Sequence, residues 1–232
     1  MPIRDELDAY VRQSFDQEWT TRSGQKVPEP GDIRLNNDSI QLEATILYAD
    51  LADSTGLVKD KRPSFAAEVY ESYVYCAAKL IRNRGGSVTA YDGDRVMGVF
   101  VGPRKNSDAA RCALEINGAV NDIINPALRS QYPKSNYTVT QKVGIDVSDV
   151  WVVNTGIRGN NDHVWVGTAA NYAAKMAAFD LGYRSYITAR VYGRLLDSSK
   201  LGGTSQENMW TSLGFKSEVN GVVYGSRFKW SI

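Results

Sequence analysis

The chain has 232 residues, and its 27 Lys and Arg residues nearly balance its 26 Asp and Glu residues. This length suits one domain with an extension, and the small net charge favours neither a nucleic-acid partner nor a membrane surface. We find no apolar run that is long enough to span a membrane and no signal-peptide pattern at Met1, so we expect a cytoplasmic protein.

The few histidine and cysteine residues do not predict a catalytic or metal site. His163 is the single histidine, which argues against a histidine-based zinc site and against a Ser-His-Asp triad. Cys76 and Cys112 lie in helical patterns without metal-type spacing, so we expect both to be buried, reduced thiols.

Residues 1–32 are predicted to form a helix and a linker that precede a compact domain over residues 33–232. Apolar side chains recur on one side of a helix over residues 4–15, at Leu7, Tyr10, Val11 and Phe15. This face could contact a partner or a second copy, or it could pack on the chain's own domain. Residues 22–32 contain two glycines and two prolines, which predicts an irregular linker.

The stretch Ile46–Thr55, ILYADLADST, combines a predicted strand with a cluster of polar residues. An apolar run ends at Asp50, and a run of that kind predicts a buried strand. Asp53, Ser54 and Thr55 are good N-cap residues, so we expect a helix to begin there. A carboxylate at a strand end, beside free backbone N–H groups at a helix start, can hold a metal-bound polyphosphate.

The rest of the chain alternates predicted helices and strands. A hairpin is expected around an Asp92-Gly93 turn, and a second one around Asn220-Gly221. The other expected elements are helices over 64–83, 107–124 and 167–179 and strands over 137–147, 150–157 and 184–188. This order predicts an α+β, ferredoxin-like fold, with an antiparallel sheet and helices packed on one face.

Asp94 follows the predicted Asp92-Gly93 turn and is the second candidate metal ligand. In the ferredoxin-like plan the first strand lies beside this hairpin, so Asp50 and Asp94 can meet. With the backbone carbonyl of Leu51 they would offer hard oxygen ligands to two Mg²⁺ or Mn²⁺ ions. Taken singly, each aspartate also fits a capping or turn role, and that alternative stays open.

Four segments resemble the signature motifs of class III nucleotide cyclases, in that family's order and spacing. ILYADLADST resembles the first metal motif, and YDGDRVMGVF (Tyr91–Phe100) is similar to the second. VGIDV (143–147) resembles a strand that usually contains Ile-Gly-Ile. WVGTAANYAAKMA (165–177) resembles the helix that presents an Asn and, four residues later, an Arg to the transition state. The resemblance covers roughly residues 41–190 and implies a head-to-tail homodimer with two shared sites.

By this resemblance, Asp50 and Asp94 match the metal-binding aspartates. Four further residues match the loop and helix start that cradle the triphosphate: Ala52, Asp53, Ser54 and Thr55.

The resemblance also assigns a transition-state role to the helix of the partner chain. Asn171 matches the asparagine that positions the ribose, and Lys175 stands where the family usually has arginine. Lysine keeps the charge but loses the forked donor. Asn220 aligns with a triphosphate-binding lysine, so Lys216 or Arg227 would have to replace that charge.

The departures at the base pocket separate this chain from the purine cyclases. Ala90 and Val164 stand where adenylate cyclases have a base-reading lysine and aspartate, and the corresponding guanine-reading pair is absent too. Tyr48 replaces the common phenylalanine, and Trp165 follows Val164. A smaller ring would suit this pocket, although ordinary core packing would also explain Tyr48 and Trp165.

This pattern resembles the pyrimidine cyclases of bacterial Pycsar anti-phage systems. The resemblance implies that UTP is converted to 3′,5′-cyclic UMP, which switches on a downstream effector; a cytidylate cyclase that makes cyclic CMP is the alternative. Relaxed or purine specificity remains open, and so does a degenerate cyclase domain that binds a nucleotide or a partner without turnover.

Overall fold

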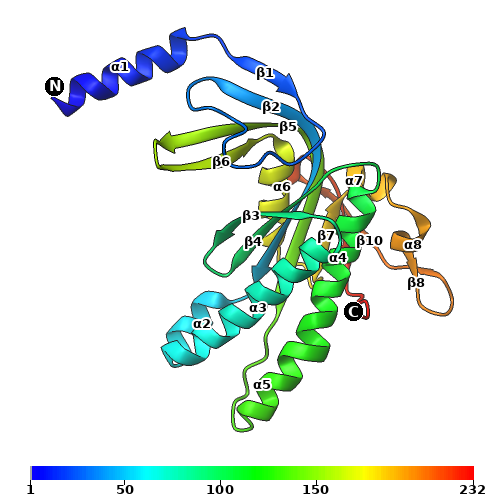
Figure 1. Ribbon diagram of the computed structural model, residues 1–232. Coiled ribbons are helices and arrows are strands. Elements are labelled where there is room, and N and C mark those ends of the chain that lie inside the picture. Colours follow the sequence, from blue (N-terminus) through cyan, green and yellow to red (C-terminus); the bar gives the residue numbers. More distant parts are fainter. Residues whose placement is uncertain (1) are drawn as a thin grey trace.

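The computed structural model describes residues 2–232 and is built around a nine-stranded mixed sheet (Figure 1). The strands of this sheet are β1 (Thr20–Ser23), β2 (Asp38–Leu51), β3 (Ser87–Asp92), β4 (Arg95–Phe100), β5 (Gln141–Ile157), β6 (Asn160–Val166), β7 (Ser185–Thr188), β10 (Thr211–Lys216) and β11 (Gly221–Ser226). Their order is β10-β11-β7-β5-β2-β4-β3, with β1 beside β2 and β6 beside β5. A separate two-stranded sheet joins β8 (Leu201–Gly202) to β9 (Glu207–Asn208).

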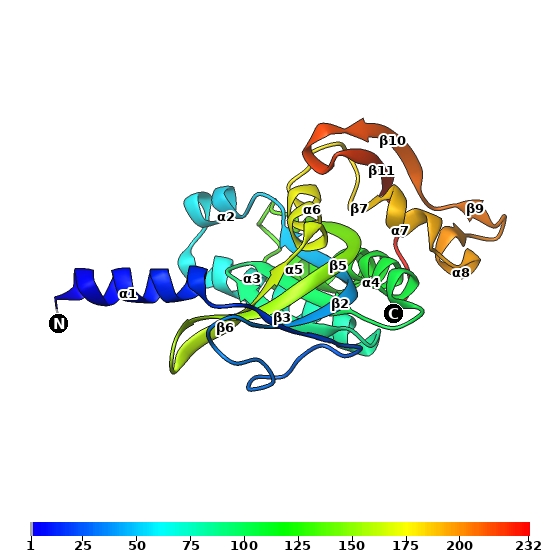
Figure 2. The same ribbon diagram turned by 90° about the horizontal axis from the view of Figure 1, so that it is seen from above.

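Helices pack around this sheet, and the N-terminal helix extends away from it (Figure 2). The α-helices are α1 (Ile3–Asp16), α2 (Ser54–Asp60), α3 (Pro63–Asn83), α4 (Lys105–Ala119), α5 (Asn125–Gln131), α6 (Thr168–Ala177), α7 (Ala189–Gly193) and α8 (Asp197–Lys200). A π-helical turn, η1 (Val120–Ile124), joins α4 to α5, and a 3₁₀ turn, η2 (Ser217–Val219), follows β10. No helix among residues 2–232 is long and apolar enough to cross a membrane.

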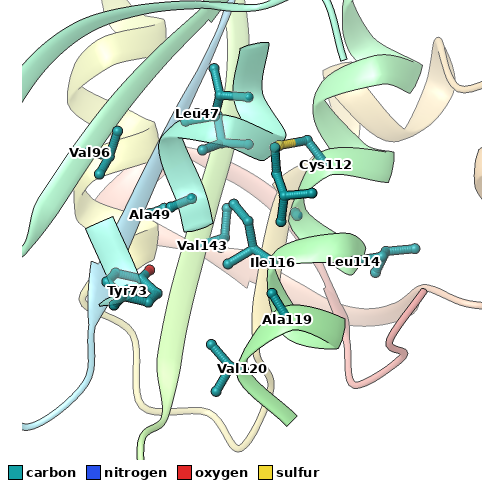
Figure 3. Packing of buried hydrophobic residues seen from close by; sticks show 14 of the residues in the cluster. Leu47, Ala49, Tyr73, Val96, Cys112, Leu114, Ile116, Ala119, Val120 and Val143 are labelled. Atoms are coloured by element: carbon teal, nitrogen blue, oxygen red, sulfur yellow. The ribbon is translucent and has the colours of Figure 1, made fainter. Parts of the chain in front are cut away.

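Strand β2 places alternate side chains in two separate cores. Leu47 and Ala49 pack with α3 and α4, in the larger core of which Figure 3 shows a part. Ala44 and Ile46 pack with α6 on the other face. Successive side chains of a strand point to opposite faces of its sheet, so helices cover both faces.

The α+β class is therefore confirmed, but two details of the predicted plan were wrong. The sheet is mixed and not purely antiparallel, because β5 pairs with β7, and β1 with β2, in parallel. Helices also pack on both faces instead of one. The small side chains of α6 let this helix lie against the sheet on the face opposite α3 and α4.

The predicted strands over 137–147 and 150–157 proved to be one strand, β5. Strand β5 pairs antiparallel with β2 and also with β6, a strand that the sequence did not predict. Ser148 and Asp149, which lie between the two predicted strands, continue the pairing with β2, because both apolar stretches of β5 pair with the same long strand. The helices predicted over 64–83 and 167–179 are confirmed as α3 and α6, with shifts of one or two residues.

The β3–β4 turn is displaced by one residue from its predicted position. Asp92 pairs with Arg95, so the two loop residues are Gly93 and Asp94. Gly93 has a φ of +60°, which suits glycine at the first position of a tight hairpin turn. Asp94 therefore lies at the tip of the hairpin rather than beyond it.

Helix α1 projects away from the rest of the molecule (Figure 1). Helix α1 buries no residue, and the side chain of Phe15 is 86% exposed, so packing of α1 on its own domain is not observed. Within the segment predicted to be a linker, Arg22 and Ser23 belong to β1 and pair with β2.

Close packing of α6 on β5 depends on Gly144. A Cβ atom there would lie 2.1 Å from the carbonyl oxygen of Ala173 and 2.7 Å from the backbone nitrogen of Ala177. Backbone atoms cannot move aside as a flexible side chain can, so Gly144→Ala should lower the free energy of unfolding by more than about 2 kcal/mol. Urea denaturation would measure this loss. Gly193→Ala is the control, since that position has open space and should change stability by less than about 0.5 kcal/mol; equal effects at both positions would contradict the packing argument.

Candidate active site

Asp50 lies at the end of β2 and forms an ion pair with Arg95, the first residue of β4. The Nη2 atom of Arg95 donates to Oδ2 of Asp50 at 2.9 Å. The two residues meet because β2 and β4 are antiparallel neighbours and Asp50 stands directly opposite Arg95 in the register. Sequence reasoning missed Arg95, although its place directly after Asp94 was a usable signal.

The electrostatics around Asp50 favour a bound cation. Burial raises the pKa of the Asp50 carboxyl, and the nearby charges of Asp94 and Asp92 raise it further, while Arg95 opposes the shift. Several carboxylates thus share a poorly solvated site with one guanidinium group. A divalent cation would relieve this excess of negative charge.

Asp94 approaches the same place from the hairpin tip. Its Oδ2 atom is buried and has no hydrogen-bond partner within residues 2–232. A buried carboxylate oxygen without a partner is costly, and a cation is one way to satisfy it.

Two tyrosines also border this acidic site, and sequence reasoning missed both of them. Burial raises the pKa of Tyr73 on α3 well above its usual value, and the charges of Asp50 and Asp94 add to that shift. Burial likewise raises the pKa of Tyr137 to about 12, with a further contribution from Asp53. Neither hydroxyl has a hydrogen-bond partner in the described part of the chain. Each hydroxyl is therefore a buried polar group without a partner beside the two aspartates.

The donor set fits a magnesium-type ion that also binds phosphate. No group of three or more His, Cys, Asp and Glu side chains gathers in a metal-binding arrangement between Pro2 and Ile232. Two carboxylates nonetheless suffice for Mg²⁺ when substrate phosphates and water complete the shell. Leu51 is 3% exposed and its side chain packs in the larger core, so only its backbone carbonyl could join them.

The loop after β2 forms the expected helix start, but without the expected side-chain cap. Helix α2 begins at Ser54, and Asp53 occupies the N-cap position without a side-chain hydrogen bond. Asp53 adopts a left-handed conformation, with a φ of +57°. A Cβ atom at Gly56 would lie 2.7 Å from either carboxylate oxygen of Asp53, so this carboxylate covers the first turn of α2.

Ala52 and Thr55 complete this loop. The backbone N–H of Ala52 donates to the carbonyl of Thr140 at 2.9 Å. Ala52 and Ser54 are half-buried, whereas Thr55 is exposed. In the structure the Asp53 carboxylate covers the first turn of α2, so a phosphate could reach the backbone N–H groups of this turn only if that carboxylate moved.

Helix α6 carries the two residues that the resemblance links to the transition state. Asn171 and Lys175 are both exposed and lie one helical turn apart. The Nζ atom of Lys175 donates to the carbonyl of Glu218 at 3.0 Å and lies 5.8 Å from the centre of the Tyr172 ring. Lys175 thereby connects α6 to the turn that ends at Asn220, so these two residues lie in one region.

The predicted base-pocket residues divide between a packed core and an exposed edge. Tyr48 and Ala90 pack against the α6-side core, and Trp165 is buried within it. Val164 is 44% exposed on β6. Core packing therefore explains why a large apolar side chain stands at position 165. The indole N–H of Trp165 nonetheless has no hydrogen-bond partner within residues 2–232.

Tyr48 is the base-pocket residue with the clearest polar environment. It is half-buried, and burial raises the pKa of its hydroxyl. The Arg95 guanidinium lies 5.9 Å from the centre of its ring. Arg95 thus links the candidate base pocket to Asp50.

Comparison with known proteins identifies the family of this chain. No family model matches it. A uridylate cyclase of Xanthomonas perforans is 42% identical over the full length of both chains, and a uridylate cyclase of Burkholderia cepacia matches equally well.

The fold comparison agrees with this result. The crystal structure of the guanylyl cyclase Cya2 superimposes with a TM-score of 0.67 at 18% identity, covering 82% of this chain and 94% of that chain. The acidic end of β2, the hairpin aspartate and the Asn171–Lys175 helix thus occur in a cyclase fold. The chain belongs to the uridylate cyclases, within the class III nucleotide cyclases.

Proposed function

We propose that this protein converts UTP to 3′,5′-cyclic UMP and pyrophosphate. The observation that carries the proposal is 42% identity to uridylate cyclases over the whole chain, combined with retention of both candidate metal ligands, Asp50 and Asp94. A domain that had lost metal binding would have no need to keep two poorly solvated carboxylates.

The pocket chemistry supports a pyrimidine base. Ala90 and Val164 have no polar side-chain atoms, so they cannot pair with the hydrogen-bonding edge of a purine. A purine there would leave its polar groups unpaired, at a cost of about 1–3 kcal/mol for each group. The Tyr48 hydroxyl can donate or accept, so it serves uracil or cytosine. UTP is favoured because the full-length relatives are uridylate cyclases.

The aspartates and one carbonyl would hold the metal. Asp50, Asp94 and the backbone carbonyl of Leu51 supply hard oxygen ligands suited to two Mg²⁺ or Mn²⁺ ions, completed by substrate phosphates. Bound there, such ions would lower the pKa of the ribose 3′-hydroxyl and neutralise charge on the leaving pyrophosphate. Arg95 would then have to share or release its ion pair with Asp50.

The side chains of this chain position the reactants. In the reaction, the 3′-oxygen bonds to the α-phosphorus as the bond to the pyrophosphate oxygen breaks, and the hydroxyl proton leaves to solvent. Asn171 would hold the ribose, and Lys175 would stabilise negative charge that develops on the phosphates. The first turn of α2 would bind the triphosphate through the backbone, with the Asp53 carboxylate turned away from its present position.

The two parts of the site suit a head-to-tail homodimer. No hydrogen bond or ion pair joins the Asp50–Asp94–Arg95 group to Asn171 or Lys175 within the described chain. Each part would therefore be completed by the other part of a second copy. On the same family resemblance, we propose that the cyclic nucleotide acts as a second messenger that switches on an effector in anti-phage defence.

The substrate prediction can be tested with the four ribonucleoside triphosphates. Incubation of the full chain with each of them and Mn²⁺, followed by mass spectrometry, should yield 3′,5′-cyclic UMP from UTP as the main product. Asp50→Ala should abolish the product and leave a folded dimer. Cyclic CMP as the main product would move the assignment to cytidylate cyclase, and product from ATP alone, or none from any substrate, would refute the proposal.

The metal prediction concerns Asp94 and its neighbour Asp92. Asp94→Asn should weaken Mn²⁺ binding about 10–100-fold, measured by calorimetry, because one charged ligand is lost. Asp92→Asn is a matched control on the same hairpin and should change the affinity less than about threefold, since its exposed side chain is not a predicted ligand. If Asp94→Asn binds Mn²⁺ as the unmodified protein does, Asp94 is not a ligand.

A further inference from the structure

The surface between α6, α7 and β11 contains a hollow of about 200 Å³ that the proposed reaction has not used. Thr168, Tyr172, Arg190 and Asn220 contribute to its lining. Asn220 stands where the family resemblance expects a triphosphate-binding lysine, so this hollow lacks that cation. Arg190 is a positively charged group on the same wall.

Arg190 is held in place by a buried carboxylate. Asp146 on β5 is fully buried, and its Oδ2 atom accepts a hydrogen bond from Arg190 Nη2. Its Oδ1 atom accepts from the hydroxyl of Thr188 at 2.5 Å. A buried carboxylate requires such partners, so the Arg190 guanidinium is anchored beside the hollow.

The other side of Arg190 faces α6. Its Nη2 atom also donates to Oγ1 of Thr168 at 3.3 Å, and its guanidinium lies 5.6 Å from the centre of the Tyr172 ring. Lys175 lies 5.8 Å from the same ring. The two cations thus flank one aromatic side chain on the helix that carries Asn171.

Part of the Arg190 guanidinium remains available. The side chain is 45% exposed, and its Nη1 and Nε atoms donate to no acceptor within residues 2–232. A guanidinium group presents its donors in a planar fork that matches phosphate oxygens, which a lysine cannot reproduce.

The other candidate replacements for the missing lysine, Arg227 and Lys216, are less well placed to contact a phosphate in this hollow. The Nε atom of Arg227 donates to the carbonyl of Gly182 at 2.8 Å, and its guanidinium lies 4.5 Å from the centre of the Tyr183 ring. Within the described chain, neither Arg227 nor Lys216 lines the hollow. The sequence-based suggestion that one of these two replaces the missing lysine is therefore not favoured.

We propose that Arg190 contacts the β- and γ-phosphates of the substrate and supplies the cation that Asn220 lacks. The inference rests on the proposed cyclase function, because that function brings a triphosphate to the exposed face of α6. Asp146 then acts as a positioning residue that holds Arg190 toward the hollow. Lys175 and Arg190 together would bind the pyrophosphate as it leaves.

Calorimetric titration of the full chain with inorganic pyrophosphate and Mg²⁺ tests the contact. Arg190→Gln should weaken pyrophosphate binding by about tenfold or more, as expected for the loss of a charged hydrogen bond. Arg190→Lys should lose less, because the charge remains. Arg194→Gln is the matched control on the same segment; Arg194 pairs with Glu43 on the surface, and its loss should leave the affinity unchanged. Unchanged binding by folded Arg190→Gln would overturn the inference.

Two further measurements separate a phosphate contact from a structural role. Because Arg190→Gln leaves the Asp146 carboxylate unpaired, the double variant Asp146→Asn/Arg190→Gln provides a folded alternative with no buried charge. Both variants should keep the affinity for cyclic UMP, which lacks the pyrophosphate group. Equal losses for cyclic UMP and pyrophosphate would show that Arg190 only supports α6, and would also overturn the inference. If the unmodified protein cyclises no nucleotide, the proposed function fails, but the pyrophosphate titration still tests Arg190.

Discussion

Antiparallel pairing of β2 with both β4 and β5 is the constraint on which the rest of the structure depends. It places Asp50 opposite Arg95 on one side and opposite Lys142 on the other. The alternation of side chains along β2 sends Ala49 and Leu51 into the core under α3 and α4 and leaves Tyr48 and Asp50 for the other face. The same register therefore fixes which side chains of β2 pack in the core and which reach the candidate site. A slip of one residue would move each side chain to the opposite face of the sheet.

Charge is divided between two regions of the surface. Asp50 and Asp94 concentrate negative charge where Arg95 is the nearby cation, whereas α6 and α7 present Lys175 and Arg190 beside the Tyr172 ring. A metal-bound triphosphate needs both kinds of group, since the metal is held by carboxylates and the phosphates by cations. No hydrogen bond or ion pair joins these two groups within residues 2–232, and this observation motivates the proposed shared site.

The sequence predicted the main helices and the β3–β4 hairpin because these depend on local patterns such as apolar periodicity and turn residues. The class of chemistry was implied by the resemblance of four motifs to class III nucleotide cyclases. It missed the pairing of β6 with β5 and the helix on the second face, which depend on contacts between distant segments. It also missed Arg95, Tyr137 and the Asp146–Arg190 pair. Their roles come from neighbours that only the folded chain brings together, and no single-residue pattern reports such neighbours.

The central claim, a site built from two copies, is tested most directly with a purified heterodimer of two inactive chains. One chain would carry Asp50→Ala and the other Asn171→Ala, with different tags to isolate the mixed dimer. If each site takes its metal ligands from one chain and its ribose contact from the other, one of the two sites is intact, and the heterodimer should show about half the UTP-cyclising activity of the unmodified dimer. A mixed dimer as inactive as either variant alone would contradict the shared site.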